Sequence, residues 1–179
     1  MIMMSLYWTV VSWQQERFGL LASQRGLLRL TLPQETPEDP MAIIRSYRDV
    51  VLKSDEPLSC YGEQLRAYLA GHLRQWTIPL DVRGTDFQLA VWRALEDIPY
   101  GTTWTYRQVA DVIGRPSATR AVGAAVGRNP LPLVIPCHRV VGSNGTLTGF
   151  RGGLLLKERL LALEGVGGIS TRGHARFSF

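Results

Sequence analysis

Short hydrophobic runs separated by turn residues occupy the first third of the chain, and this pattern is typical of β-strands. Three such runs, rich in Leu, Val and aromatic residues, cover residues 6–11, 18–23 and 26–32. Gly, Gln and Arg residues punctuate the stretches between them. We therefore expect the chain to begin with a small antiparallel meander of three strands.

Two helices are predicted to accompany these strands. Apolar residues recur at helical spacing over 41–52 and again over 59–70, where Gly71 is a suitable end. A further short strand is predicted at 78–83. The front of the chain is thus expected to form an α/β domain, a small antiparallel sheet with helices, at residues 1–83.

From residue 84 onward the hydrophobic spacing becomes helical. Four helices are predicted, at 86–95, 106–113, 118–127 and 154–163, with Thr85, Thr105 and Ser117 as N-caps of the first three. The second and third are joined by a tight turn that contains Gly114, which makes them a helix-turn-helix candidate. Residues 131–135 are an apolar run that we expect to be extended. These features predict a mainly helical C-terminal domain at 84–165, followed by a disordered tail at 166–179.

The positive charge of the chain lies entirely in its second half. The net charge is +5. Residues 1–83 carry nine basic and nine acidic side chains, whereas residues 84–179 carry eleven basic and six acidic ones. A basic half joined to a neutral half indicates contact with a polyanion such as nucleic acid, although a solvated cationic face would give the same pattern.

Composition narrows the class of protein further. Hydrophobic residues make up 45% and charged residues 20% of the chain, which suits a globular protein with a buried core. No apolar run approaches the roughly 18 residues of a membrane span, and we expect neither a signal peptide nor membrane association. The only cysteines, Cys60 and Cys137, are not in a CxxC pair, so we expect no metal site and no disulfide framework. These features together predict a cytoplasmic protein.

Cys137 is the candidate nucleophile. Most lone cysteines are small buried hydrophobes, but this one is followed by His138 and Arg139, and neighbouring cations lower the pKa of a thiol. In an extended segment adjacent side chains point to opposite sides, so we expect a water molecule between Cys137 and His138. A carboxylate usually orients such an imidazole, and Glu158 and Glu164 are the candidates.

Several motifs of the second half form a recognisable series. They are Gly123-Ala124-Ala125 leading into Asn129-Pro130, the run Ile135-Pro136-Cys137-His138-Arg139-Val140-Val141, and the pairs Gly152-Gly153, Lys157-Glu158 and Glu164-Gly165. In this order and spacing, over residues 84–165, the chain resembles the O6-alkylguanine-DNA alkyltransferases, which are methylated-DNA–protein-cysteine methyltransferases. The front third resembles the N-terminal domain of that family in size and outline only.

The resemblance implies DNA repair by direct reversal of alkylation. Cys137 would accept a methyl or other alkyl group from O6-alkylguanine, or O4-alkylthymine, once per molecule and without a cofactor. His138 would act as the water-mediated general base, Glu164 would orient it, and Asn129 would tie the recognition helix to the active-site segment. The expected partner is double-stranded DNA, contacted by a monomer in the minor groove.

The resemblance also implies a DNA-binding surface and a substrate pocket. Arg120 would fill the gap left by the flipped nucleotide, and Tyr106 would press on the phosphate and contact the flipped base. Small residues let a helix approach a narrow groove closely, so the DNA-binding set is Arg120, Tyr106, Ser117, Ala118, Ala121, Gly123 and Arg128. The expected pocket residues are Tyr106, Val126, Pro132, Val140, Phe150 and Arg151. Phe150 and Arg151 depart from the family, which often has Tyr and a small residue there.

Three other functions fit parts of the sequence. A catalytically silent, alkyltransferase-like DNA-damage binder would share the fold, but its acceptor position holds another residue in place of Cys137. A helix-turn-helix regulator would explain the arginines but not the motif around Cys137. A thiol hydrolase would use the same Cys and His pair but would regenerate, so counting alkyl groups per chain distinguishes all three.

Overall fold

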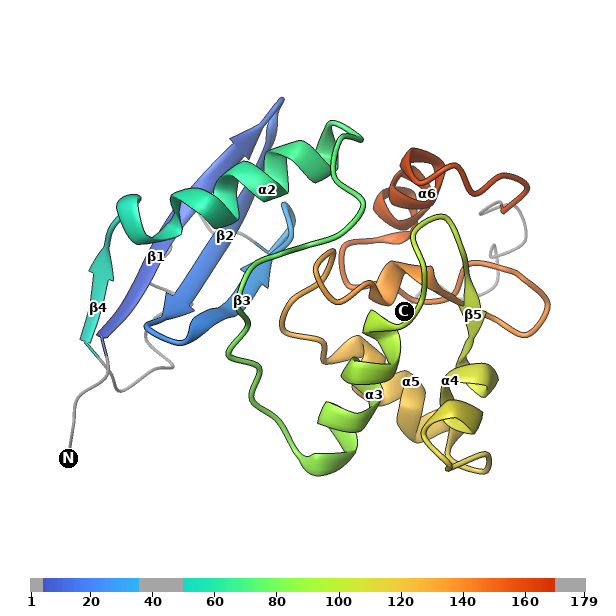
Figure 1. The fold of residues 1–179 in the computed structure, drawn as a ribbon. Helices are drawn as coiled ribbons and strands as arrows, with labels where there is room; N and C mark the ends of the chain where they lie inside the picture. Colours follow the sequence, from blue (N-terminus) through green and yellow to red (C-terminus); the bar gives the residue numbers. More distant parts are fainter. Residues whose placement is uncertain (1–4, 36–49, 170–179) are drawn as a thin grey trace. The chain divides into compact units, whose positions relative to one another are not determined.

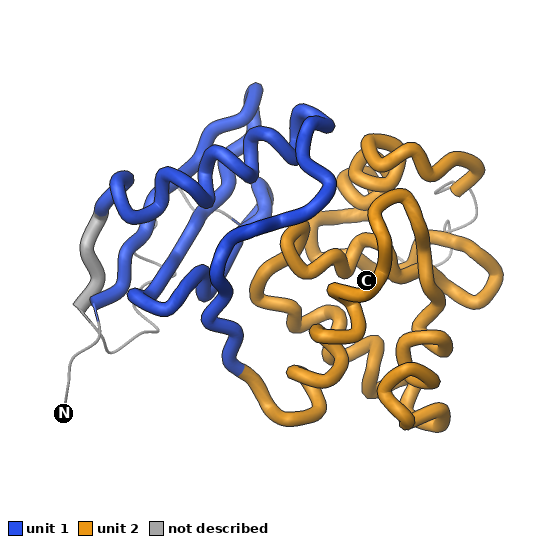
Figure 2. The backbone as a smooth tube through the Cα atoms, viewed as in Figure 1, with its two compact units in different colours: residues 1–83 blue, residues 84–179 orange. Residues whose placement is uncertain are grey.

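A computed structural model describes residues 5–35 and 50–169 of the chain. The backbone forms two compact units, Met1–Arg83 and Gly84–Phe179 (Figure 2). Within the described ranges, no helix combines the length and the apolar character that crossing a membrane requires.

The first unit is built on a four-stranded sheet (Figure 1). Its strands are β1 (Ser5–Trp13), β2 (Glu16–Ser23), β3 (Gly26–Thr31) and β4 (Val50–Lys53). The first three pair antiparallel in sequence order, which confirms the meander. β4 lies beside β1 and runs parallel to it, so the complete sheet is mixed.

The helix predicted at 41–52 is wrong at its C-terminal end. Residues 50–52 belong to β4, because their backbone pairs with residues 5–7 of β1, and this pairing overrides the helical spacing of the apolar residues. The remainder of that prediction, 41–49, lies outside the described residues. The strand predicted at 78–83 is also wrong, since only an isolated parallel bridge between Leu27 and Leu80 forms there.

The second predicted helix is confirmed as α2 (Ser59–Leu69), which follows the short 3-10 helix η1 (Glu56–Leu58). It buries Tyr61, Leu65 and Tyr68, three residues at helical spacing. Gly71 follows its end with φ of 77°, a left-handed conformation that glycine adopts without strain. These buried residues and the apolar faces of the strands, such as Leu6, Leu21 and Leu28, supply the core of the unit.

The second unit is mainly helical. Its helices are α3 (Asp86–Glu96), α4 (Tyr106–Val112), α5 (Thr119–Gly127) and α6 (Leu154–Leu163), and the two-residue strands β5 (Trp104–Thr105) and β6 (Val140–Val141) pair in parallel. Thr85 and Thr105 cap α3 and α4 as predicted, each within a capping box. α5 packs against α3 and α4, and the indole of Trp92 donates a hydrogen bond of 2.9 Å to the carbonyl of Ala125.

Two predictions for the second unit need correction. Ser117 is not an N-cap: α5 begins at Thr119, its N-cap is Ala118, and no side chain caps it. Residues 131–135 form a turn closed by a hydrogen bond from the N–H of Ile135 to the carbonyl of Leu131, not an extended run. Prolines before, within and after this segment have no N–H to contribute to a strand, which explains the turn.

The part of the predicted tail that the structure describes is packed. Val166 and Ile169 lie against the buried cluster of Val141, Leu147 and Leu161, so residues 166–169 do not follow the expectation of disorder. Burial of these apolar side chains is favourable because it removes them from water. The tail shows no helical or strand periodicity, so the sequence did not indicate this packing. Residues 170–179 lie outside the described part of the chain.

Candidate active site

Cys137 begins a single turn of 3-10 helix, η2 (Cys137–Arg139), not an extended segment. The side chain is buried, with 6% of its surface exposed, and the preceding turn and Pro136 are buried with it. Burial raises the pKa of the Cys137 thiol, while a hydrogen bond with Asn129 and the positive charges of Lys157 and Arg151 lower it. Burial prevails, so Cys137 is held as a thiol beside groups that stabilise its thiolate.

Asn129 connects the end of α5 to the segment that carries Cys137. Its buried amide donates a hydrogen bond of 2.7 Å from Nδ2 to the carbonyl of Ile135 and accepts one of 2.9 Å at Oδ1 from the N–H of Leu131. Both ends of the side chain amide are therefore used to fix the turn before Cys137. A buried amide satisfied in this way rigidifies the backbone around it.

His138 is oriented by a carboxylate from the other end of the unit. Its Nε2 lies 2.7 Å from Oε1 of Glu164, the residue that ends α6, and both side chains are fully buried. Glu164 is thus the carboxylate, of the two candidates, that contacts the imidazole. Burial lowers the pKa of His138, and the contact with Glu164 only partly opposes this, so the imidazole is neutral near neutral pH.

Arg139 holds the same carboxylate from its other side. Its Nε and Nη2 donate to Oε2 and Oε1 of Glu164 over 2.8 and 3.0 Å, and Nη1 donates to the carbonyl of Ile98 over 2.6 Å. The N–H of Gly101 completes the cage with a hydrogen bond of 3.1 Å to Oε2. Bidentate pairing of this kind fixes geometry as well as charge. The sequence suggested Arg139 as a cation for Cys137, whereas its guanidinium binds Glu164.

Lys157 is a site residue for which sequence reasoning proposed no role. Its side chain is fully buried, and Nζ donates to the carbonyls of Val140 over 2.6 Å and of Thr148 over 3.0 Å. Burial lowers the pKa of Lys157 to about 8. A signal was present in the sequence: Lys157 shares the helical spacing of Leu160, Leu161 and Glu164, which placed a cation on the buried stripe of α6.

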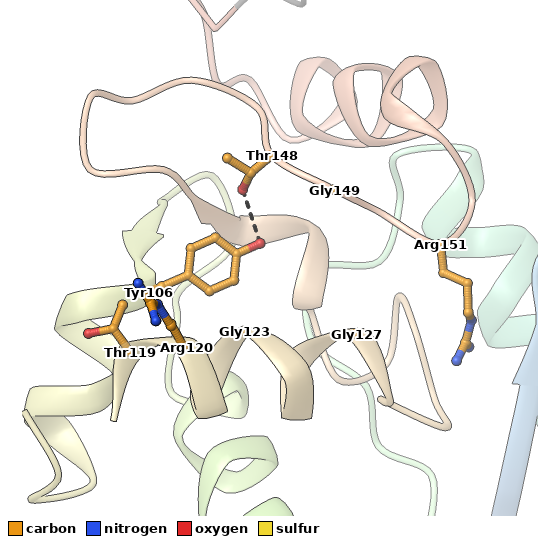
Figure 3. Close-up of a pocket in the computed structure, with 8 residues that line it drawn as sticks. All are labelled: Tyr106, Thr119, Arg120, Gly123, Gly127, Thr148, Gly149 and Arg151. Carbon is orange, nitrogen blue, oxygen red and sulfur yellow. Dashed lines mark hydrogen bonds between the residues drawn. The ribbon is translucent and has the colours of Figure 1, made fainter. Parts of the chain in front are cut away.

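A hollow of about 550 Å³ opens beside α4 and α5 (Figure 3). It is lined by Tyr106, Thr119, Arg120, Gly123, Gly127, Thr148, Gly149 and Arg151. In Figure 3, Tyr106, Thr119 and Arg120 lie at one end of this view and Arg151 at the other. Burial raises the pKa of the Tyr106 phenol, and the charge of the nearby Cys137 thiolate adds to this effect.

The hollow contains only part of the predicted site. Of the expected pocket residues, Tyr106 and Arg151 line it; Val126, Pro132 and Val140 are buried outside its lining, and Phe150 is half-buried. Of the expected DNA-binding residues, Arg120 and Gly123 line it, while Ser117, Ala121 and Arg128 are exposed elsewhere and Ala118 is half-buried. Thr119, Gly127, Thr148 and Gly149 also line it and were not singled out in the sequence, because small polar residues and glycines resemble ordinary loop and helix-end residues.

Two protein-family models match the chain, one for each half. Residues 86–166 match the DNA binding domain of 6-O-methylguanine DNA methyltransferase. Residues 6–82 match the ribonuclease-like domain of the same protein family. The match in the front half is more specific than the likeness in size and outline that the sequence alone suggested.

Individual relatives agree with these models. The inducible methylated-DNA–protein-cysteine methyltransferase of Bacillus subtilis is 40% identical over 162 residues, which are 89% of this chain and 90% of that protein. The O6-methylguanine methyltransferase of Mycobacterium tuberculosis is 39% identical with a TM-score of 0.76, covering 89% and 92% of the two chains. A structure of the M. tuberculosis protein in complex with DNA is 40% identical in sequence with a TM-score of 0.78, covering 89% of this chain and 93% of that chain. The chain therefore belongs to the 6-O-methylguanine DNA methyltransferase family.

Proposed function

We propose that this protein repairs DNA by transferring an alkyl group from O6 of guanine, or O4 of thymine, to Sγ of Cys137. The observation that carries the proposal is the buried Cys137 thiol, with Asn129 and Lys157 beside it and with His138, which pairs with Glu164, on the same 3-10 turn. The relatives support the same chemistry through their names: the B. subtilis protein is a methylated-DNA–protein-cysteine methyltransferase, and the M. tuberculosis protein has been seen with DNA.

The proposed reaction is a displacement at the alkyl carbon. The bond from Sγ to carbon forms while the bond from carbon to O6 breaks, and its electron pair stays on the guanine oxygen. The thiol proton passes through a water molecule to His138, and the guanine takes up one proton in exchange, so no co-reactant is needed. Because Nε2 of His138 is hydrogen-bonded to Glu164, the imidazole accepts the proton from the water molecule at Nδ1.

Transfer would occur once per chain, because a thioether has no good leaving group. Reaction within a duplex also requires the damaged nucleotide to leave the base stack, which costs a few kcal/mol. We assign α4 and α5 as the helix-turn-helix that approaches the minor groove, with Arg120 filling the vacated place and Tyr106 contacting the flipped base. Ala121, within α5, is small and exposed, so the helix can approach a phosphate backbone closely. Arg128, at the end of α5, is also exposed and supplies a positive charge for that contact.

Stoichiometry and one substitution test this proposal. Intact-mass measurement after reaction with duplex DNA containing O6-methylguanine should show one added methyl group, on the peptide that holds Cys137. Cys137→Ala should abolish transfer and retain DNA binding, and Cys60→Ser, at the exposed second cysteine, is the matched control that should transfer normally. Sustained turnover would indicate a hydrolase, and transfer by Cys137→Ala would refute the assignment of the acceptor.

A further inference from the structure

We propose that Thr148 is a positioning residue for alkyl transfer, which acts by holding the phenol of Tyr106 in one orientation at the wall of the hollow. The inference rests on the proposed function. Thr148 Oγ1 donates a hydrogen bond of 3.1 Å to the phenol oxygen of Tyr106, across 42 positions of the chain (Figure 3). Both residues line the hollow, so this contact lies where an extruded base would enter.

Thr148 makes three contacts, one through its backbone and two through its side chain. Its carbonyl accepts a hydrogen bond of 3.0 Å from Nζ of the buried Lys157. Its methyl group lies against the backbone of Gly142, where an added Cβ would come within 3.2 Å of Cγ2. Its hydroxyl meets Tyr106. The methyl and the hydroxyl of Thr148 share one χ1 angle, so the rotamer that places the methyl beside Gly142 is also the one that directs the hydroxyl at the phenol.

The ring of Tyr106 is held from the opposite direction. Tyr106 is the first residue of α4, directly after its N-cap Thr105. The edge of the ring lies over Gly123 of α5, where an added Cβ would be 3.8 Å from Cδ1 of Tyr106. The ring is therefore placed by two helices, and its hydroxyl is placed by Thr148. Without Thr148 the ring would keep its position, but the hydroxyl would lose its partner.

The direction of the hydrogen bond defines what the phenol can do. When Thr148 donates to the phenol oxygen, the phenol hydrogen is left to bond a different acceptor. Alkylated guanine and thymine both present acceptor atoms on their edges, so Tyr106 is prepared as a donor to the base. A donor that is already oriented loses less conformational freedom when the substrate binds and reacts.

Four variants measured in single-turnover reactions test the inference: Thr148→Val, Thr148→Ser, Tyr106→Phe and the double variant Thr148→Val with Tyr106→Phe. Valine keeps the methyl contact with Gly142 and removes the hydroxyl, whereas serine keeps the hydroxyl. The substrate is duplex DNA with one O6-methylguanine, and the saturating rate is separated from the half-saturating DNA concentration. Melting temperatures of all variants control for folding.

Loss of one oriented hydrogen bond should make Thr148→Val about threefold to tenfold slower at saturation. Thr148→Ser should retain most of the wild-type rate, and half-saturation should change little. In the Tyr106→Phe background, Thr148→Val should have no further effect, because the two residues act through one contact. In spectra of protein carrying ¹³C at Cζ of tyrosine, only Thr148→Val should shift the Tyr106 resonance of the free protein, and Thr148→Ser should not.

Two results would overturn the inference while leaving the proposed function intact. The first is a Thr148→Val variant as fast as the wild type. The second is an equal loss from Thr148→Val in the wild-type and Tyr106→Phe backgrounds, which would show that Thr148 supports the loop and not the phenol. Failure of the proposed function looks different, because the wild type itself would then transfer no methyl group, and the inference would fall with it.

Discussion

The Nε2 atom of His138 lies 2.7 Å from the Oε1 atom of Glu164, although 26 positions separate the two residues in the chain. Both side chains are fully buried, and Arg139 binds both oxygens of the same carboxylate. One carboxylate therefore serves two purposes: it neutralises a buried guanidinium and it orients a neutral imidazole. Both the stability of this buried cluster and the orientation of His138 therefore depend on the negative charge of Glu164.

Glu164→Gln should both destabilise the protein and slow transfer. The change leaves the buried guanidinium of Arg139 without its counter-charge, which should lower the free energy of unfolding by about 3–5 kcal/mol. His138 would also lose its orienting anion. Denaturant unfolding and single-turnover rates measure the two effects. Glu158→Gln, a half-buried position on α6, is the matched control and should change stability by about 0.5 kcal/mol or less. Equal effects of the two variants would contradict the role of Glu164.

Lys157 should make stability depend on pH in a defined window. Its pKa is about 8 in the folded protein and 10.5 ordinarily, so between these values the unfolded chain binds a proton that the folded chain does not. Stability then rises with pH, by up to about 1.4 kcal/mol per pH unit, relative to a variant without this amine. Below pH 8 the amine is charged in both the folded and the unfolded state, so the difference in unfolding free energy between the two proteins does not change with pH.

The measurement compares the unfolding free energies of two proteins, one with Lys157 and one with Lys157→Met. Both carry Cys137→Ala so that the thiol does not titrate. Because Cys137 raises the pKa of Lys157, its removal shifts the onset below pH 8, so the unfolding free energies of the two proteins should diverge progressively between pH 7 and pH 10. A difference that stays constant up to pH 10 would show that the folded protein does not lower the pKa of Lys157. The other titrating groups are common to both proteins and cancel.

Arg120→Ala should impair repair in duplex DNA much more than reaction with free O6-methylguanine. Arg120 is exposed in the hollow near the start of α5, and filling the vacated stack matters only in a duplex. Because flipping costs a few kcal/mol, we expect a loss of about tenfold or more on duplex DNA. Arg93→Ala removes an exposed charge from α3 and controls for electrostatics alone. Equal losses on both substrates would exclude the proposed role.

Arg151→Ser should weaken DNA binding and should not raise the rate of reaction with free O6-benzylguanine; that rate should fall modestly, because the charge of Arg151 lowers the pKa of the Cys137 thiol. Arg151 is exposed and lines the hollow, and moving its charge from water into the pocket would carry a desolvation cost, so we assign the side chain to a phosphate. The slope of affinity against salt should fall by about 1, and Arg151→Lys should preserve it. A clear rise in the benzylguanine rate would show instead that Arg151 closes the pocket to bulky adducts.

Local sequence patterns correctly predicted most of the helices and strands whose formation depends on neighbouring residues. Thr85 and Thr105 cap α3 and α4 with the residues that the capping box requires. The three antiparallel strands and α2 also follow from spacing and turn residues. The local rules failed at residues 50–52 because a distant partner decided the outcome: β1 offered an edge, and these residues became a strand. At residues 131–135 the expectation of an extended run was wrong for a local reason, since prolines and the side chain of Asn129 hold a turn there.

The sequence by itself determined the acceptor motif, the family resemblance and the basic character of the second half, because these depend on residue identity and order. Only the tertiary structure decided which groups surround Cys137. It selected Glu164 over Glu158 for His138, directed Arg139 to Glu164, and buried Lys157 beside the thiol. The contact between Thr148 and Tyr106 is likewise invisible in the sequence. Hydrogen bonds and charges act over a few ångströms in space, and residues that lie 26 or 42 positions apart come within that range only when the chain folds.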